Sequence, residues 1–233
     1  MGDALIGFHN RKLPIFDPKC KLKREHFRLA PDQLSNIQLN NTMHTLIFAT
    51  NNQNKVEEIR KVTNGLFNII TLKEAGIDID IPEPYDTLEA NATEKSTVIH
   101  SMTKENVFSE DTGLEVAALN GEPGVKSARY AGEGRDFQAN IDKLLVNLEG
   151  QTDRQAQFRT VVSLILNEKE YLFEGSCKGR ITAEQKGLKG FGYDPIFIPE
   201  GADKTFAEMT MDEKNQYSHR KKAISKLIDF LLA

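Results

Sequence analysis

The sequence predicts an α/β fold in which helices flank a mixed central β-sheet. Short segments rich in β-branched and aromatic residues alternate with segments whose apolar residues recur at helical spacing. Two long apolar segments in the second half are separated only by a short polar turn, which is typical of a hairpin. Hydrophobic residues make up 39% of the 233 residues, which is ample for a buried core.

The first predicted elements are a strand, a polar loop and a helix. Residues 44–49 form a short apolar run that ends in Thr50-Asn51-Asn52. A helix is expected over 53–64, with Lys and Glu on its solvated face and Gly65 at its C-cap. The opposite face carries the apolar residues Val56, Ile59 and Val62.

A second helix is expected from about Thr87, followed by two strands. In this helix Asn91 and Lys95 are one turn apart and therefore adjacent in space. Residues 106–109 read as a strand that runs into Glu110-Asp111-Thr112-Gly113, and 114–119 as another strand closed by Asn120-Gly121. The helical spacing is that of Leu88, Ala92, Lys95, Ile99 and Met102.

A third helix and a hairpin precede the C-terminal segment. The helix carries an apolar stripe and stops at Gly150, and strands are expected over 156–166 and 171–181 around a turn at 167–169. A short strand follows at 196–198, and a capping box at 210–213 precedes a C-terminal amphipathic helix. The two stripes are Phe137, Ile141, Leu144, Leu145 and Leu148, and then Ala223, Ile224, Leu227, Ile228 and Leu231.

The chain divides into an N-terminal appendage, residues 1–42, and a domain over 43–233. The appendage shows no sustained periodicity and is interrupted by Pro14, Pro18 and Pro31; it is a vector leader, a mis-called start or a real extension. No stretch reaches the roughly 18 apolar residues needed to span a bilayer, and no signal peptide is evident. We therefore expect a cytoplasmic protein without a membrane partner, and two isolated cysteines argue against a disulfide framework.

Charge is distributed unevenly between these two parts. The formal net charge of the chain is -4, and residues 1–42 hold seven Lys/Arg against four Asp/Glu. The remaining residues are therefore acidic. Sequence-independent nucleic-acid binding depends on a basic surface, so the domain is not expected to bind nucleic acid.

Two polar clusters have the composition of a phosphate and metal site. Thr50, Asn51, Asn52 and Lys55 offer a hydroxyl, amides, helix-start N–H groups and an ammonium to a triphosphate, although a capped helix start would look the same. The adjacent acids Glu110 and Asp111 lie at an expected strand end, with Glu83 in a preceding loop, and carboxylates are what Mg²⁺ prefers. A turn with solvated acids is the alternative.

Two further clusters suit a nucleobase. In Gly190-Phe-Gly-Tyr-Asp-Pro195, glycines permit close backbone approach, an aromatic ring can stack on a base and a carboxylate can accept from base N–H groups. His219 and Arg220, with Lys214 upstream, can donate to an exocyclic oxygen. Ordinary turn chemistry and a solvated helix start are the alternatives.

The order of these clusters resembles the inosine triphosphate pyrophosphatase family over residues 43–233. The matching text also includes Pro123-Gly-Val-Lys-Ser-Ala-Arg129-Tyr130. Many relatives carry Asp-Asp-Ser-Gly where this chain has Glu110-Asp-Thr-Gly, which leaves open how Glu110 and Asp111 divide the metal ligation. The resemblance implies a two-lobed, elongated fold with a cleft between the lobes, usually as a homodimer, and the reaction of a nucleoside triphosphate with water to give the monophosphate and pyrophosphate.

The resemblance also implies roles for individual residues. Asp111 would activate the attacking water, and Glu83, Glu110 and Asp111 would bind Mg²⁺. Base recognition would fall to Phe191, Gly192, Tyr193, Asp194, Lys214, His219 and Arg220. The triphosphate would be held by Thr50, Asn51, Asn52, Lys55, Asn91, Lys95 and Thr112.

The expected substrates are ITP, dITP and XTP, whose removal keeps deaminated purines out of DNA and RNA. Their 6-oxo group suits donors from His219 or Arg220, and exclusion of GTP must involve the 2-position. The alternatives are a pyrophosphatase for other nucleoside triphosphates, including pyrimidine ones, and a nucleotide-binding module without catalysis, which has no need of the three acids.

Overall fold

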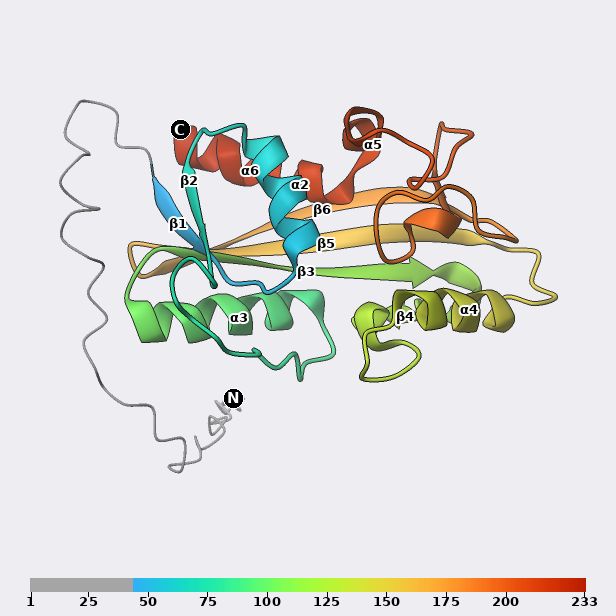
Figure 1. Ribbon diagram of the computed structural model, residues 1–233, viewed down its shortest axis with the longest axis horizontal. Helices are drawn as coiled ribbons and strands as arrows, with labels where there is room; N and C mark the ends of the chain where they lie inside the picture. Colours follow the sequence, from blue (N-terminus) through green and yellow to red (C-terminus); the bar gives the residue numbers. More distant parts are fainter. Residues whose placement is uncertain (1–43) are drawn as a thin grey trace, which may run out of the picture. The chain divides into compact units, whose positions relative to one another are not determined.

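The computed structural model describes residues 44–233, and the prediction made for residues 1–42 lies outside them. The described chain is a seven-stranded mixed sheet with helices on both faces, which confirms the predicted fold class (Figure 1). Among these residues, no helix is long and apolar enough to cross a membrane.

The sheet combines a small parallel part with a long antiparallel part. The strand order is β2-β1-β3-β5-β6-β7, and β4 pairs with β3. β1 is parallel to β2 and to β3, whereas the other pairs are antiparallel. The strands are β1 Thr45–Phe48, β2 Asn68–Thr71, β3 Val107–Val116, β4 Pro123–Gly124, β5 Gln155–Leu166, β6 Lys169–Ile181 and β7 Phe197–Pro199.

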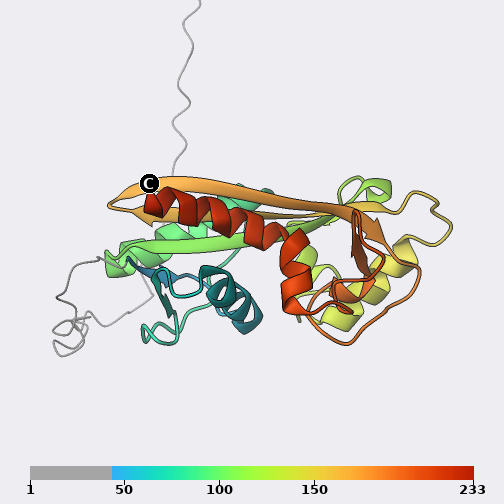
Figure 2. The same cartoon turned by 90° about the horizontal axis from the view of Figure 1, so that it is seen from above.

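Helices cover both faces of this sheet. Helix α3 (Leu88–Thr103) packs on β3 and β5 from one side. Helices α2 (Gln53–Thr63) and α6 (His219–Leu232) pack on each other on the opposite side, with α6 lying along β5 and β6 (Figures 1 and 2). Helix α4 (Phe137–Asn147) and the short α5 (Met211–Tyr217) belong to the other end of the sheet.

Local sequence signals explain where the helices begin. Asn52 caps α2, Thr87 caps α3 and Asp136 caps α4, each by accepting a backbone N–H of the first turn. The predicted capping box of Thr210 and Glu213 is present at α5. Ser218 then separates α5 from α6 and caps α6.

The buried core falls into clusters at the two ends of the sheet. One cluster joins α4 to β3, β5 and the segment after β6, including Leu114, Ile141, Phe158, Phe197 and Phe206. The others lie around β1, β2, α2, α3 and α6. The cavity that holds the predicted site residues is lined by residues from both ends of the sheet, such as Ala49 and Leu114.

Two strand predictions were wrong in detail. Residues 107–116 form a single strand, and 117–119 form a turn of 3₁₀ helix rather than part of a second strand. Glu110 and Asp111 therefore lie inside a strand and not at its end. Strand β2 was not predicted, because only four residues pair with β1 in a segment without clear alternation.

Candidate active site

A single cavity gathers most of the predicted site residues. Its lining includes residues from the β1–α2 loop, α3, β3, the loop before β7, α5 and the start of α6. Of the predicted residues, Asn91 and Glu110 do not line it. Those that do are Thr50, Asn51, Asn52, Lys55, Glu83, Lys95, Asp111, Thr112, Phe191, Gly192, Tyr193, Asp194, Lys214, His219 and Arg220.

The β1–α2 loop has a defined internal structure. The Thr50 hydroxyl accepts from the Asn52 backbone N–H at 3.1 Å, and the Asn52 side chain accepts from the Lys55 N–H at 3.3 Å. The Asn51 amide donates to the Ile79 carbonyl at 2.8 Å. These bonds fix the helix start against the cavity, where its N–H groups and macrodipole favour an anion.

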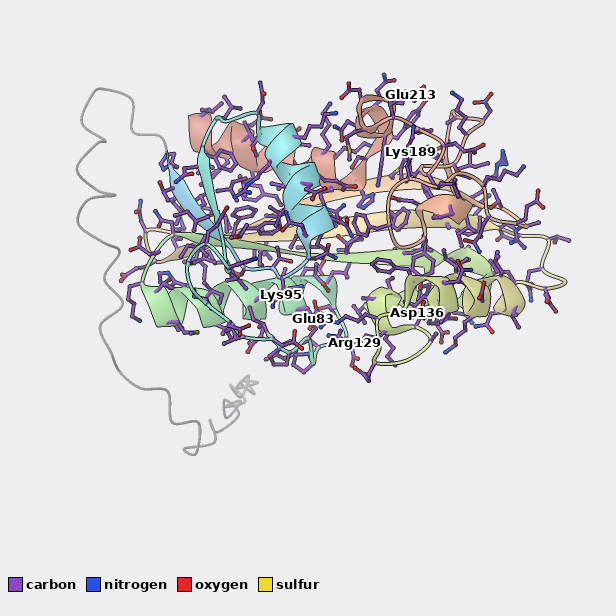
Figure 3. All side chains as sticks on the ribbon, in the orientation of Figure 1. Glu83, Lys95, Arg129, Asp136, Lys189 and Glu213 are labelled. Carbon is purple, nitrogen blue, oxygen red and sulfur yellow. The ribbon has the colours of Figure 1, made fainter. Side chains whose placement is uncertain are left out.

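Asp111 and Glu83 converge on one ammonium. Lys95 Nζ lies 2.9 Å from Asp111 Oδ1 and 2.7 Å from Glu83 Oε1. Arg129 Nη1 binds the other oxygen of Glu83 at 2.6 Å. Figure 3 shows Glu83, Lys95 and Arg129 together on the α3 side of the sheet.

The two carboxyl groups titrate differently. Burial raises the pKa of Glu83, but Lys95 and Arg129 outweigh it and lower the pKa to about 2. Burial dominates at Asp111 and raises its pKa, with Lys95 opposing the shift and the nearby Glu83 charge adding to it. Glu83 is thus a permanent anion, whereas Asp111 is the group suited to take up a proton.

Asn91 acts behind the cavity wall. Its side chain exchanges hydrogen bonds of 3.0 Å with the Tyr85 N–H and carbonyl, and its amide lies 3.5 Å from Asp111 Oδ2. It therefore ties the loop that carries Glu83 to Asp111.

Glu110 is separated from Asp111 because neighbouring residues of a strand point to opposite faces. Asp111 faces α3, whereas Glu110 faces α2 and α6. Its oxygens lie 3.0 and 2.8 Å from Arg220 Nε, and Oε1 lies 3.1 Å from Lys55 Nζ. Burial raises the pKa of Glu110, but Arg220 and Lys55 lower it to about 2.

The arrangement of carboxylates bears on the expected metal. Within residues 44–233, no group of three His, Cys, Asp or Glu side chains is placed to hold an ion. Glu83 and Asp111 nevertheless fit Mg²⁺, which commonly takes one or two carboxylates and completes its shell with phosphate oxygens and water. Glu110 does not fit with them, because its carboxylate lies on the opposite face of β3, where it binds Lys55 and Arg220.

The other end of the cavity holds a buried ionic network. Lys214 Nζ lies 2.7 Å from Asp194 Oδ2 and 2.8 Å from Glu58 Oε1. Glu58 also binds Arg220, which bridges it to Glu110. Buried cations kept in place by several carboxylates present fixed N–H groups to the cavity.

His219 differs from these charged neighbours. Its ring stacks on Phe158 with centroids 4.7 Å apart. Burial lowers the pKa of His219 well below its usual value, and Arg220 and Lys214 lower it further. The ring is therefore neutral, and its buried Nδ1 is left without a protein hydrogen-bond partner among the described residues.

The glycine-rich loop contributes both Phe191 and Tyr193 to the cavity lining, but only Phe191 leaves its ring without a structural hydrogen bond. The Phe191 N–H donates to Asp194 Oδ2 at 3.0 Å, and the half-buried ring lies 5.4 Å from Lys214 Nζ. The Tyr193 hydroxyl donates to the Ser127 carbonyl at 2.9 Å, which commits it to the structure. Gly190 has a φ of 77°, and a Cβ there would collide with Asp194.

Comparison with known proteins decides the family. The model of the Ham1 family matches residues 46–230. The chain belongs to the Ham1 family. It is 49% identical to the dITP/XTP pyrophosphatase of Flavobacterium johnsoniae over 188 residues, covering 81% of this chain and 98% of that one. With the enzyme of the same name from Porphyromonas gingivalis, identity is 50% over 191 residues, with 82% and 98% covered.

Solved Ham1 structures share the fold. The Staphylococcus aureus Ham1 protein has a TM-score of 0.73 at 41% identity, covering 80% of this chain and 97% of that one. A HAM1 protein from Coxiella burnetii has a TM-score of 0.75 at 35% identity, covering 82% and 99%. At these sequence identities, both proteins can be compared with this chain in sequence as well as in fold.

This Ham1 site also contains residues that sequence reasoning did not select. Glu58 was placed on the solvated face of α2, yet it is 5% exposed and binds Lys214 and Arg220. Arg129 holds Glu83. The available signal was that Glu58 lies among the apolar residues of α2. Its partners Lys214 and Arg220 are 156 and 162 residues further along the chain, so the sequence did not reveal them.

Proposed function

We propose that this chain hydrolyses ITP, dITP and XTP to the monophosphate and pyrophosphate. The printed names of its relatives support this reaction. The observation that carries the proposal is one cavity with two chemically distinct ends. Lys55, Lys95 and two carboxylates lie at one end, and an aromatic ring with buried N–H donors lies at the other.

The phosphate end supplies charge and a base. Lys55, Lys95 and the N–H groups that open α2 bind the triphosphate oxygens. Glu83 and Asp111 would hold Mg²⁺, which would supply positive charge against the charge that develops on the phosphates. Asp111, whose carboxylate faces the cavity, accepts a proton from the water that attacks the α-phosphorus.

We assign Glu110 a different role from the one expected at first. It keeps Lys55 and Arg220 in place from the far face of β3 and does not bind the metal. The Thr112 hydroxyl lies 3.5 Å from Arg220 Nη2 and 2.6 Å from the Thr160 hydroxyl. Asn91 orients Asp111 rather than binding phosphate.

The base end favours a 6-oxo purine. Phe191 stacks on the base, and Arg220, Lys214 and neutral His219 offer donors to the oxygen. The 6-amino group of adenine is itself a donor, so it leaves these groups unpaired in a buried site, which costs orders of magnitude in specificity.

The test is a screen for pyrophosphate release across ITP, dITP, XTP, the four standard triphosphates and pyrimidine analogues, with and without Mg²⁺. We expect rapid release only from ITP, dITP and XTP, and only with the metal. Equal hydrolysis of GTP and ITP would overturn the substrate assignment. Binding without any release would instead support a nucleotide-binding module.

We also propose that the enzyme is a cytoplasmic homodimer. The support is the resemblance of the whole domain to a family that is usually dimeric. Sedimentation of the purified chain at the dimer mass supports this assignment, and a single monomer peak at micromolar concentration contradicts it.

A further inference from the structure

Phe137 departs from the helical pattern to which it belongs. It is the first residue of α4 and begins the stripe that continues with Ile141, Leu144 and Leu148. Those three side chains are at most 2% exposed and lie in the core cluster, whereas Phe137 is 40% exposed and lies outside that cluster. A large apolar side chain has therefore been kept out of the core.

The ring of Phe137 lies in the active-site cavity instead. Phe137 lines the same cavity as Phe191, and the two ring centroids are 6.1 Å apart with the planes tilted by 47°. Asp136 fixes the start of α4 by accepting the Ala139 N–H at 3.1 Å. In Figure 3, Asp136 marks the end of α4 that lies toward Arg129 and Glu83.

The two rings line the same space, but they are tilted and slightly too close for a flat ligand to lie between them. A base stacked between two rings needs about 3.5 Å on each side, or about 7 Å in all. The observed centroid separation of 6.1 Å is short of this by about 1 Å and the planes are tilted by 47°, so one ring must move outward and turn to take a base. The Phe191 backbone is held by its N–H bond to Asp194, whereas the Phe137 side chain is 40% exposed, so Phe137 is the ring that we expect to move.

We propose that Phe137 is the second aromatic wall of the base site, so that the purine is held between Phe137 and Phe191. This inference rests on the proposed nucleotide substrate. A stacked ring contacts the π-face, which every base has. The edge of the base, which differs between bases, is contacted by Lys214, His219 and Arg220. Phe137 therefore contributes affinity for all purine substrates without contributing to the choice among them.

The test compares Phe137→Ala and Phe137→Leu with wild type, using Val146→Ala as the matched control. Val146 lies on the same helix, is 59% exposed and lines no described cavity. The measurements are kcat and KM for ITP and XTP, and the inhibition constant of inorganic tripolyphosphate, which has no base. Melting temperatures check that the variants are folded.

We expect both Phe137 variants to raise KM about tenfold for ITP and for XTP, as loss of one stacking partner does. Their kcat and the inhibition constant of tripolyphosphate remain within twofold of wild type, and Phe137→Trp restores KM. Unchanged KM in Phe137→Ala, or a parallel rise in the tripolyphosphate constant, overturns the inference alone. Wild-type enzyme that does not hydrolyse ITP overturns the proposed function as well.

Discussion

Replacing Glu110 by Gln tests whether Glu110 is a structural counter-ion or a metal ligand. Glu110 is 1% exposed and neutralises Arg220 and Lys55. Removing one partner of a buried ion pair costs about 3 to 5 kcal/mol, and Gln retains one acceptor oxygen, so we expect the lower end of that range. For a chain of this size, a loss of about 3 kcal/mol lowers the melting temperature by about 6 to 12 °C.

The assay is thermal unfolding combined with a Mg²⁺ titration of pyrophosphate release. Glu74→Gln is the matched control, because Glu74 pairs with Arg60 on the surface, where such pairs contribute less than about 1 kcal/mol. Glu83→Gln is the contrast, since Glu83 faces the cavity. We expect Glu83→Gln to raise the Mg²⁺ concentration required for activity and Glu110→Gln to leave it unchanged.

The opposite result would refute this reasoning. If Glu110→Gln melts within 2 °C of wild type but needs far more Mg²⁺, then Glu110 is a metal ligand and its contacts with Arg220 and Lys55 are secondary.

Two further predictions concern stability and helix placement. Because the folded pKa of Glu110 is lowered to about 2 from 4.5, its stabilisation is complete above pH 4.5 and is lost as pH falls toward 2. The stability difference between wild type and Glu110→Gln in urea unfolding should therefore shrink by about 1 kcal/mol between pH 7 and pH 4, and a difference independent of pH would contradict it. A Cβ at Gly175 would collide with the backbone of His219 and Ala223, so Gly175→Ala should cost about 1 to 3 kcal/mol and raise KM for ITP. Gly134→Ala, where a Cβ meets nothing within 4 Å, is the control and should change neither; equal effects would show that α6 is not positioned by Gly175.

Local patterns in the sequence predicted the helices and their starts well. Asn52 and Thr87 are short polar side chains followed by helical spacing, and each caps the helix that was expected there. The predicted capping box at Thr210 is present, but it opens the short helix α5, and the expected C-terminal helix begins separately at Ser218. Asn91 and Lys95 are one turn apart and adjacent, as predicted, and both contact Asp111, which their spacing alone did not indicate.

The interior of β3 could not be predicted in the same way. Four polar or small residues, Glu110 to Gly113, interrupt the apolar pattern, so the segment reads as a loop between two strands. They form a strand because cations from distant elements neutralise the acids: Lys95 from α3 faces one side, and Lys55 from α2 with Arg220 from α6 faces the other. Such partners are visible only in three dimensions.

The same cause explains the division of labour among the acids. Successive side chains of a strand point to opposite faces, so Glu110 and Asp111 lie on opposite faces of β3. The prediction that they lie at a strand end had placed both beside one metal. Most of the residues chosen from the sequence line one cavity, whereas the separation of the two acids onto opposite faces could be seen only in the sheet.

The central claim is that Asp111 accepts the proton of the attacking water in hydrolysis of a non-standard purine triphosphate. Asp111→Asn should fold, because Lys95 retains its 2.7 Å contact with Glu83. In single-turnover pyrophosphate release from ITP, we predict a loss of about 10² or more in rate while calorimetric binding of ITP stays measurable. A variant that turns over ITP within a few-fold of wild type would contradict the claim.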